Sequence, residues 1–172
     1  MALKTDIRGM VWHYPHRFCV GSEQIRQYAK AIKTTDPASL DIDAARELGH
    51  DRVVAPLTFI SILAIMIQRD FFQHVDLGLE TLQVVQVDQK FTFHRPIYDG
   101  DVLLGAMHID SVEERFGADI VTSRNVLTHA ETGEVVMEAF TTLMGHQGEV
   151  NISASWDPET GQVLRKPDAH ED

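Results

Sequence analysis

The stretch VVAPLTFISILAIMIQRDFFQHV, residues 53–75, decides the fold. Pro56 suits the start of a helix, and apolar side chains from Phe59 to Ile67 then cover almost every side of it. A helix that is apolar all round in a protein outside the membrane has to be surrounded by other structure. The sequence therefore predicts one central helix, about five turns long, that is wrapped by the rest of the chain.

Composition limits the function classes. The net charge of −11 argues against nucleic acid as the main partner, because phosphate binding needs a basic face. The longest apolar stretch, Pro56 to Ile67, is too short to span a bilayer, and the first ten residues contain no apolar core of signal-peptide length. Cys19 is the single cysteine, so no intrachain disulfide can form. We expect a cytoplasmic protein without integral membrane association.

After Gly78 the hydrophobic period changes. In residues 84–93, VVQVDQKFTF, apolar residues alternate with polar ones, which predicts a long strand. Further strands are expected over residues 101–112, where Gly105 marks a bulge or a point of close packing, and over 118–129 and 134–145, which form a hairpin. Helices that precede strands favour the α+β class with an antiparallel sheet. A sheet laid around one apolar helix is the hot-dog arrangement.

The N-terminal part predicts short elements. Residues 16–21, HRFCVG, are typical of a short strand, and residues 23–33 of an amphipathic helix with Ser22 as its N-cap. A second short helix begins at Asp43 as N-cap and ends at Gly49. We expect one hot-dog domain over residues 1–150. Residues 151–172 form a C-terminal extension with a late turn or hairpin and a disordered end.

Several motifs together resemble one family. They include YPHRF, VVAPLTF, VQVDQKFTFHRPI followed by GD, DSVEERFGADIV and TTLMG, and the resemblance covers roughly residues 1–150. The chain is similar to the MaoC-like, R-specific hydratase and dehydratase branch of the hot-dog fold. Within it the chain looks most like the HadC-type, and also the HadA-type, subunits of the mycobacterial (3R)-hydroxyacyl-ACP dehydratase.

The resemblance implies a site without its reactive groups. Catalytic members carry an Asp and a His on a loop after the first helix, and alignment on Pro37 places Thr34 and Ser39 at those two positions. An unassisted hydroxyl does not act as a base near neutral pH. Catalytic members also have a glycine at the start of the central helix, whose amide helps form the oxyanion hole, and here the residue is Leu57. We therefore expect no catalytic residue on this chain.

The family implies a role in substrate binding. HadA- and HadC-type subunits bind the long acyl chain, while a HadB-type partner supplies the Asp/His dyad in a heterodimer of type II fatty acid synthesis, in mycolic acid elongation. The long 3-hydroxyacyl chain arrives on an acyl carrier protein, and neither a cofactor nor a metal is expected. The expected partner interface is Gln86, Asp88 and Lys90. The expected acyl-binding residues are Pro56, Thr58, Phe59, Ser61, Ile62, Ile65 and Met66.

Other interpretations remain open. The apolar helix residues serve core packing first, and Asp88 also fits a solvated strand face. Lys90, Arg95 and Arg124 could meet the phosphopantetheine of a carrier. A hot-dog acyl-thioesterase would use a carboxylate on the central helix, for which Asp70 is the candidate. A non-enzymatic acyl-binding homodimer would differ from a dehydratase subunit in its assembly state.

Overall fold

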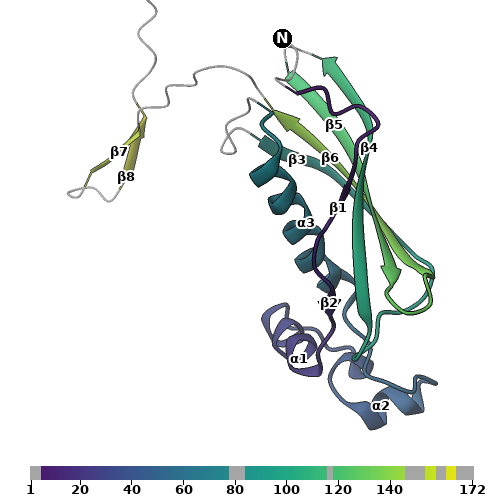
Figure 1. Cartoon of the computed structure of the whole chain (residues 1–172). Helices are drawn as coiled ribbons and strands as arrows, with labels where there is room; N and C mark the ends of the chain where they lie inside the picture. The colour runs from purple at the N-terminus through teal and green to yellow at the C-terminus, as the bar shows by residue number, and fades with distance from the viewer. Residues whose placement is uncertain (1–4, 78–83, 116–117, 146–153, 158–161, 166–172) are drawn as a thin grey trace, which may run out of the picture.

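The computed structural model describes residues 5–77, 84–115, 118–145, 154–157 and 162–165. Over these residues an antiparallel sheet curves along one long helix, with the shorter helices gathered at one end (Figure 1). The predicted α+β hot-dog arrangement is confirmed. The element bounds, in chain order, are β1 Val11–His13, β2 Phe18–Cys19, α1 Ser22–Ala31, η1 Pro37–Ser39, α2 Ile42–Glu47, η2 Leu57–Ile60, α3 Ser61–His74, β3 Val84–Phe93, β4 Val102–Arg115, β5 Ala118–His129, β6 Val135–Gly145, β7 Ala154–Asp157 and β8 Gln162–Arg165.

The main sheet has the strand order β1-β4-β5-β6-β3, and β2 pairs with β4 beside β1. The predicted hairpin is confirmed, since β5 and β6 pair antiparallel from Asp119 opposite Gly145 to Thr128 opposite Val135. Among the described strands of this sheet, β3 lies at one edge and pairs only with β6. A second, two-stranded sheet is formed by β7 and β8, which confirms the late hairpin. The predicted disordered end falls outside the described residues, apart from Arg165.

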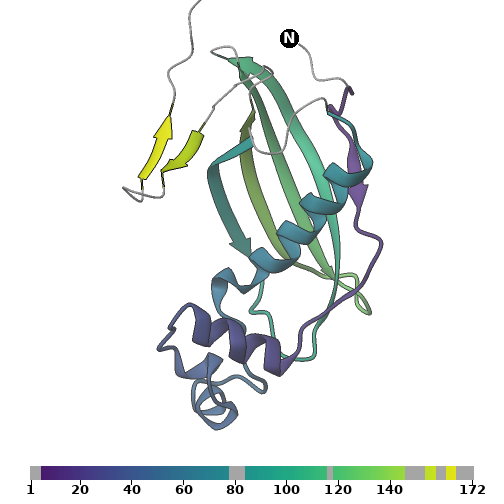
Figure 2. The same ribbon diagram turned by 90° about the vertical axis from the view of Figure 1, so that its left-hand side faces the viewer.

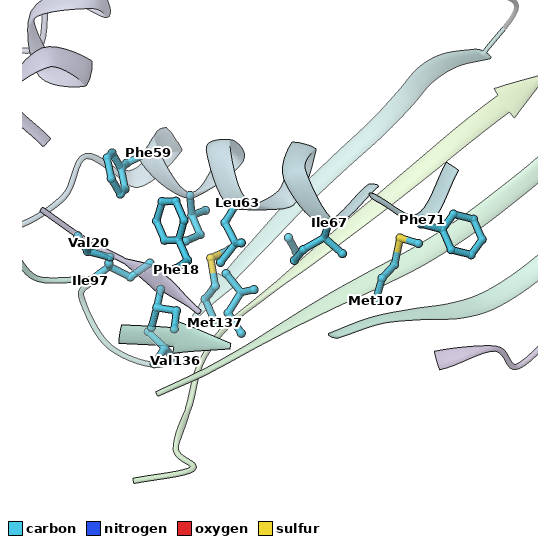
Figure 3. Close-up of a cluster of buried hydrophobic side chains, with 14 of the residues drawn as sticks. Phe18, Val20, Phe59, Leu63, Ile67, Phe71, Ile97, Met107, Val136 and Met137 are labelled. Carbon is cyan, nitrogen blue, oxygen red and sulfur yellow. The ribbon is translucent and has the colours of Figure 1, made fainter. Parts of the chain in front are cut away.

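The core lies between α3 and the sheet. Phe59, Leu63, Ile67 and Phe71 follow one another at helical spacing along one stripe of the η2–α3 segment and are buried. Figure 3 shows this stripe pointing at the sheet, where Met107 and Met137 meet it. Burial of each such side chain contributes about 1.5–3 kcal/mol. The apolar run therefore fixes where the sheet lies.

The expectation that the helix is surrounded on every side is wrong for the chain alone. Leu57 is 69% exposed, Ile65 63% and Met66 38%, so the η2–α3 segment is not covered all round. Figure 2 shows α3 on the concave face of the sheet with its outer side uncovered. The helix also begins later than predicted, because η2 follows Pro56 and α3 starts at Ser61. None of the helices in the described part of the chain is long and apolar enough to cross a bilayer.

A bulge in β3 changes the direction of its side chains. Gln86 pairs with Leu143 and Asp88 with the adjacent Thr142, so Val87 is an extra residue. An extra residue reverses the alternation on its N-terminal side. As a result Val85 and Val87 are 55% and 51% exposed, although the sequence pattern grouped them with the apolar face of the strand.

The two short helices use different caps from those predicted. The N-cap of α1 is Gly21 rather than Ser22, and the amide of Gly21 donates to Oε1 of Gln24 at 3.0 Å. The N-cap of α2 is Asp41 rather than Asp43, because Oδ1 of Asp41 accepts from the amides of residues 43 and 44. A capping carboxylate near the first turn also interacts favourably with the helix dipole.

Candidate functional site

The loop between α1 and α2 holds its shape through its own polar groups. Oγ1 of Thr34 accepts from the amide of Asp36 at 3.2 Å, and Oδ1 of Asp36 accepts from the amide of Ala38 at 3.1 Å and caps η1. The carbonyl of Ala38 accepts from the amide of Val54, which ties the loop to the segment before η2. The hydroxyl of Thr34 and the carboxylate of Asp36 thus serve backbone geometry.

Ser39 is 2% exposed, and its Oγ has no hydrogen-bond partner among the described residues. Thr34 is half-buried, and its hydroxyl is already an acceptor in the turn. Neither residue ionises near neutral pH, so neither takes a proton from a substrate carbon. The carboxylate of Asp36 is occupied by the cap of η1.

Leu57 occupies the first position of η2 with its side chain in solvent. The residues beside it serve packing. Pro56 is buried, the carbonyl of Thr58 accepts from the hydroxyl of Tyr28 at 2.8 Å, and the ring of Phe59 packs edge-on against Tyr28. Of the expected acyl-binding residues, these three therefore form a structural corner at the start of the helix.

A cavity of about 250 Å³ lies between α3 and the β3 side of the sheet, and we call it the outer cavity. Of the predicted acyl-binding residues, Ser61 and Ile65 line it, whereas Ile62 packs on the core and Met66 does not border it. Gln86 also borders it, because the β3 bulge turns this residue toward the helix, so Gln86 belongs to the cavity wall as well as to the strand edge. The remaining lining residues are Ala64, Gln68, Gln89, Phe91, Asn125 and Thr141.

The wall of the outer cavity on the sheet side is polar. Thr141 donates from Oγ1 to Oε1 of Gln89 at 3.1 Å, and Nε2 of Gln89 donates to the carbonyl of Phe140 at 2.9 Å. Asn125 is 3% exposed, and its Oδ1 has no partner among the described residues. A buried amide oxygen without a partner costs about 1–3 kcal/mol, so this wall favours an occupant that solvates it.

A second, narrower cavity of about 20 Å³ continues along the helix, and we call it the inner cavity. Gln68 borders both cavities. The inner walls are mainly apolar, with Phe71 and Phe72 from α3 and Met107, Val121 and Leu143 from the sheet, and Asp119 and Ser123 add polar groups from β5. The sequence did not predict most of the residues that line the two cavities. One signal could have identified the helix side of the outer cavity, namely the three- and four-residue spacing of Ser61, Ala64, Ile65 and Gln68.

Asp70 lies on another side of α3. Its Oδ2 accepts from Nε1 of Trp12 at 2.8 Å, and its backbone carbonyl lies 2.8 Å from Nδ1 of His74. The Trp12 ring also packs edge-on against Phe71. Asp70 lines neither cavity. It anchors β1 to α3, which weighs against its use as a thioesterase carboxylate.

The basic residues considered for a carrier phosphate are already engaged. Arg95 binds Asp101 at 2.6 Å and Glu134 at 3.4 Å, Arg124 binds Glu138 at 3.0 Å, and Nζ of Lys90 lies 5.5 Å from the Phe140 ring centre. Burial would raise the pKa of Asp101, but hydrogen bonds from Arg95 and the Tyr98 amide and the charges of Arg95 and Arg52 outweigh it and lower that pKa. The resulting cluster stabilises the turn before β4.

Apolar side chains remain exposed on two elements in the chain alone. They are Ile65 and Met66 on α3 and Val85 and Val87 on β3. Asp88 and Lys90, which were expected at a partner interface, lie exposed on the same edge strand. An edge strand with exposed backbone and apolar side chains is a template for pairing with another chain. Within the described residues, no three or more His, Cys, Asp or Glu residues gather as a metal site.

Comparison with known proteins places these features in a family. The model of the family described as "FAS1-like, dehydratase domain region" matches residues 8–139 of the chain. The chain belongs to this FAS1-like dehydratase family. A UPF0336 protein of Mycobacterium tuberculosis (strain H37Rv) is 58% identical over 165 residues, which cover 96% of this chain and 99% of that protein.

Solved structures of the dehydratase family agree with the fold. A chain of the C-terminally truncated HadBC (3R-hydroxyacyl-ACP dehydratase) complex from M. tuberculosis is 57% identical, with a TM-score of 0.77, over 83% of this chain and all of that chain. A MaoC-like dehydratase is 34% identical, with a TM-score of 0.78, over 86% of this chain and 44% of that one. The resemblance to MaoC-like and HadC-type dehydratase proteins is therefore confirmed.

Proposed function

We propose that this chain is the non-catalytic, acyl-chain-binding subunit of a heterodimeric (3R)-hydroxyacyl-ACP dehydratase. The observation that carries the proposal is the pair of alcohols at positions 34 and 39: the Thr34 hydroxyl accepts from the loop backbone, and the buried Ser39 hydroxyl has no partner among the described residues. The similarity to a chain of the HadBC complex supports a subunit that works beside another chain.

The reaction needs ionisable groups, which Thr34 and Ser39 do not supply. Removal of water from a 3-hydroxyacyl thioester takes a proton from the α-carbon, forms the α,β double bond and breaks the β C–O bond, while a second group protonates the leaving hydroxyl. A base and an acid near neutral pH are therefore required. We assign both to an Asp/His dyad on a HadB-type partner.

The acyl chain has a place on this subunit in the outer cavity, between α3 and β3. Each methylene removed from water contributes about 0.8 kcal/mol before ordering costs. Ala64, Ile65 and Phe91 supply apolar contact there, and the polar wall accounts for the rest of the lining. This division leaves chemistry to one subunit and a groove to the other.

The partner fits the exposed apolar side chains of α3 and β3. Pairing at the free edge of β3 would continue the sheet across two chains beside Val85 and Val87, and Ile65 and Met66 would add apolar contact from the helix. Asp88 and Lys90 would lie at this contact. Delivery by an acyl carrier protein, a cytoplasmic location and a role in type II fatty acid synthesis and mycolic acid elongation belong to the same proposal.

Co-expression with a HadB-type chain tests the proposal. We expect a stable one-to-one complex by native mass spectrometry, and formation of enoyl product from 3-hydroxyacyl thioesters by the complex. The partner's dyad variants should abolish turnover. A purified chain that dehydrates these thioesters alone at the rate of the complex would refute the assignment. A stable homodimer that ignores the partner would favour a non-enzymatic acyl-binding protein instead.

A further inference from the structure

The outer and inner cavities differ in size and in chemistry, and Gln68 lies between them. The outer cavity of about 250 Å³ includes Ile65, which is 63% exposed, so it opens at the face where a partner would deliver the chain. The inner cavity of about 20 Å³ is lined only by buried and half-buried residues. An acyl chain therefore meets the outer cavity first.

The outer cavity has a mixed lining, in which polar groups lie beside the apolar side chains of Ala64, Ile65 and Phe91. A methylene chain in it covers the unpartnered Oδ1 of Asn125, the Ser61 hydroxyl and the Gln68 amide without offering hydrogen bonds. Loss of water from these groups offsets much of the gain from burying the chain. Short chains consequently gain little from each added methylene.

The inner cavity has more apolar walls. Phe71, Phe72, Met107 and Leu143 supply them, but its volume of about 20 Å³ leaves little room beyond Gln68. The Gln68 amide makes no hydrogen bond to any described residue and is half-buried, so little holds it in place at the boundary. Displacement of this one side chain would join the two spaces.

We propose that Gln68 is a specificity-determining gate that makes the groove select long acyl chains against short ones. This inference rests on the proposed acyl-binding function. Chains that end in the outer cavity stop before Gln68, whereas longer chains displace it and enter the apolar space. Beyond that length each methylene raises kcat/KM by about fourfold, the effect of moving one CH₂ from water to an apolar site.

The test uses the assembled dehydratase complex and a series of saturated (3R)-3-hydroxyacyl thioesters of increasing length. We expect a plot of log kcat/KM against length that is shallow for short chains and steep for long ones. Gln68→Ala should move the break to shorter chains. The matched control is Gln73→Ala, an exposed glutamine of the same helix that borders neither cavity, and it should leave the profile unchanged.

Two variants on other elements make the test independent of the gate residue. Leu143→Trp fills the inner cavity and should remove the steep part while short chains react as before. Ala64→Phe fills the outer cavity and should lower kcat/KM at every length. A profile without a break, or a break that Gln68→Ala does not move, would overturn the gate alone. Failure of Ala64→Phe to change any rate would overturn the proposed acyl-binding function itself.

Discussion

The δ-carbon of Ile67 on α3 fills the space in which a side chain on Gly105 of β4 would begin. The methyl groups of Leu127 on β5 lie close to the same point, with Cδ2 at 3.3 Å from the position of an added β-carbon. The central helix can therefore approach the sheet this closely only where β4 has a glycine. The sequence expectation of close packing at Gly105 is confirmed.

Gly105→Ala should lower the free energy of unfolding by about 1–3 kcal/mol, because it forces a methyl group into a filled core. Ile67→Val removes the δ-carbon and should by itself cost about 0.5–1.5 kcal/mol. The double variant should lose less than the sum of the two single losses. Chemical denaturation of all three measures this coupling, and strict additivity would contradict the contact.

Asp101 is fully buried and pairs with Arg95 and, at 3.0 Å, with Arg52. Its pKa in the folded protein is lowered from the ordinary value of 3.8. The unfolded chain then binds a proton more readily than the folded one. The contribution of Asp101 to stability is complete above that ordinary value and is lost as the pH falls through the lower folded pKa.

Asp101→Asn should therefore cost roughly 3 kcal/mol at neutral pH, since it leaves the two guanidinium groups with a neutral partner. The cost should shrink in strong acid. Urea unfolding of the wild type and variant at several pH values measures it, with Asp51→Asn, an exposed neighbour, as control. A cost that stays constant down to strong acid would argue against the ion pair as its cause.

Val87 is the extra residue of the β3 bulge and is half exposed. Val87→Lys should weaken binding of a HadB-type partner by at least about tenfold, because a charge in an apolar contact loses its water. Stability of the isolated chain should stay nearly unchanged. Val135→Lys, at a 37% exposed position at the start of β6, provides a control. Equal effects of the two variants on affinity would place the partner elsewhere.

Thr34→Val with Ser39→Ala should leave the kcat of the complex within about twofold, because neither hydroxyl acts as a base or an acid near neutral pH. Ser39→Ala removes a buried hydroxyl with no partner among the described residues, so it should be neutral or slightly stabilising. Steady-state dehydration and thermal unfolding measure the two effects. A hundredfold loss of kcat with a normal melting temperature would assign these alcohols a chemical role.

The sequence predicts the fold class and the strands because each element has its own period. The N-caps of the two short helices were predicted one or two residues too late. Gly21 and Asp41 are the caps, although the nearby Ser22 and Asp43 are equally good capping residues. The sequence predicted a covered outer side for α3, and this was wrong because the exposed Ile65 and Met66 are as apolar as the buried stripe.

Most of the cavity lining could not be predicted, because it depends on how distant segments align. Asn125 and Thr141 face the helix through the register of β5 and β6, which no local pattern reveals. Gln86 borders the outer cavity only because of the bulge that follows it. Thr34 and Ser39 come from the family motif, and no local pattern in the sequence singles them out.

The extra residue in β3 belongs to the strand margin and not to the groove. Deletion of Val87 would restore a regular ladder with the same partners, because Gln86 would still lie opposite Leu143 and Asp88 opposite Thr142. Gln86 would therefore stay toward the helix, and Val85 would stay on the other face. The loss of three nucleotides would thus straighten the margin and remove one greasy side chain from it, while the lining of the chamber stayed as it is.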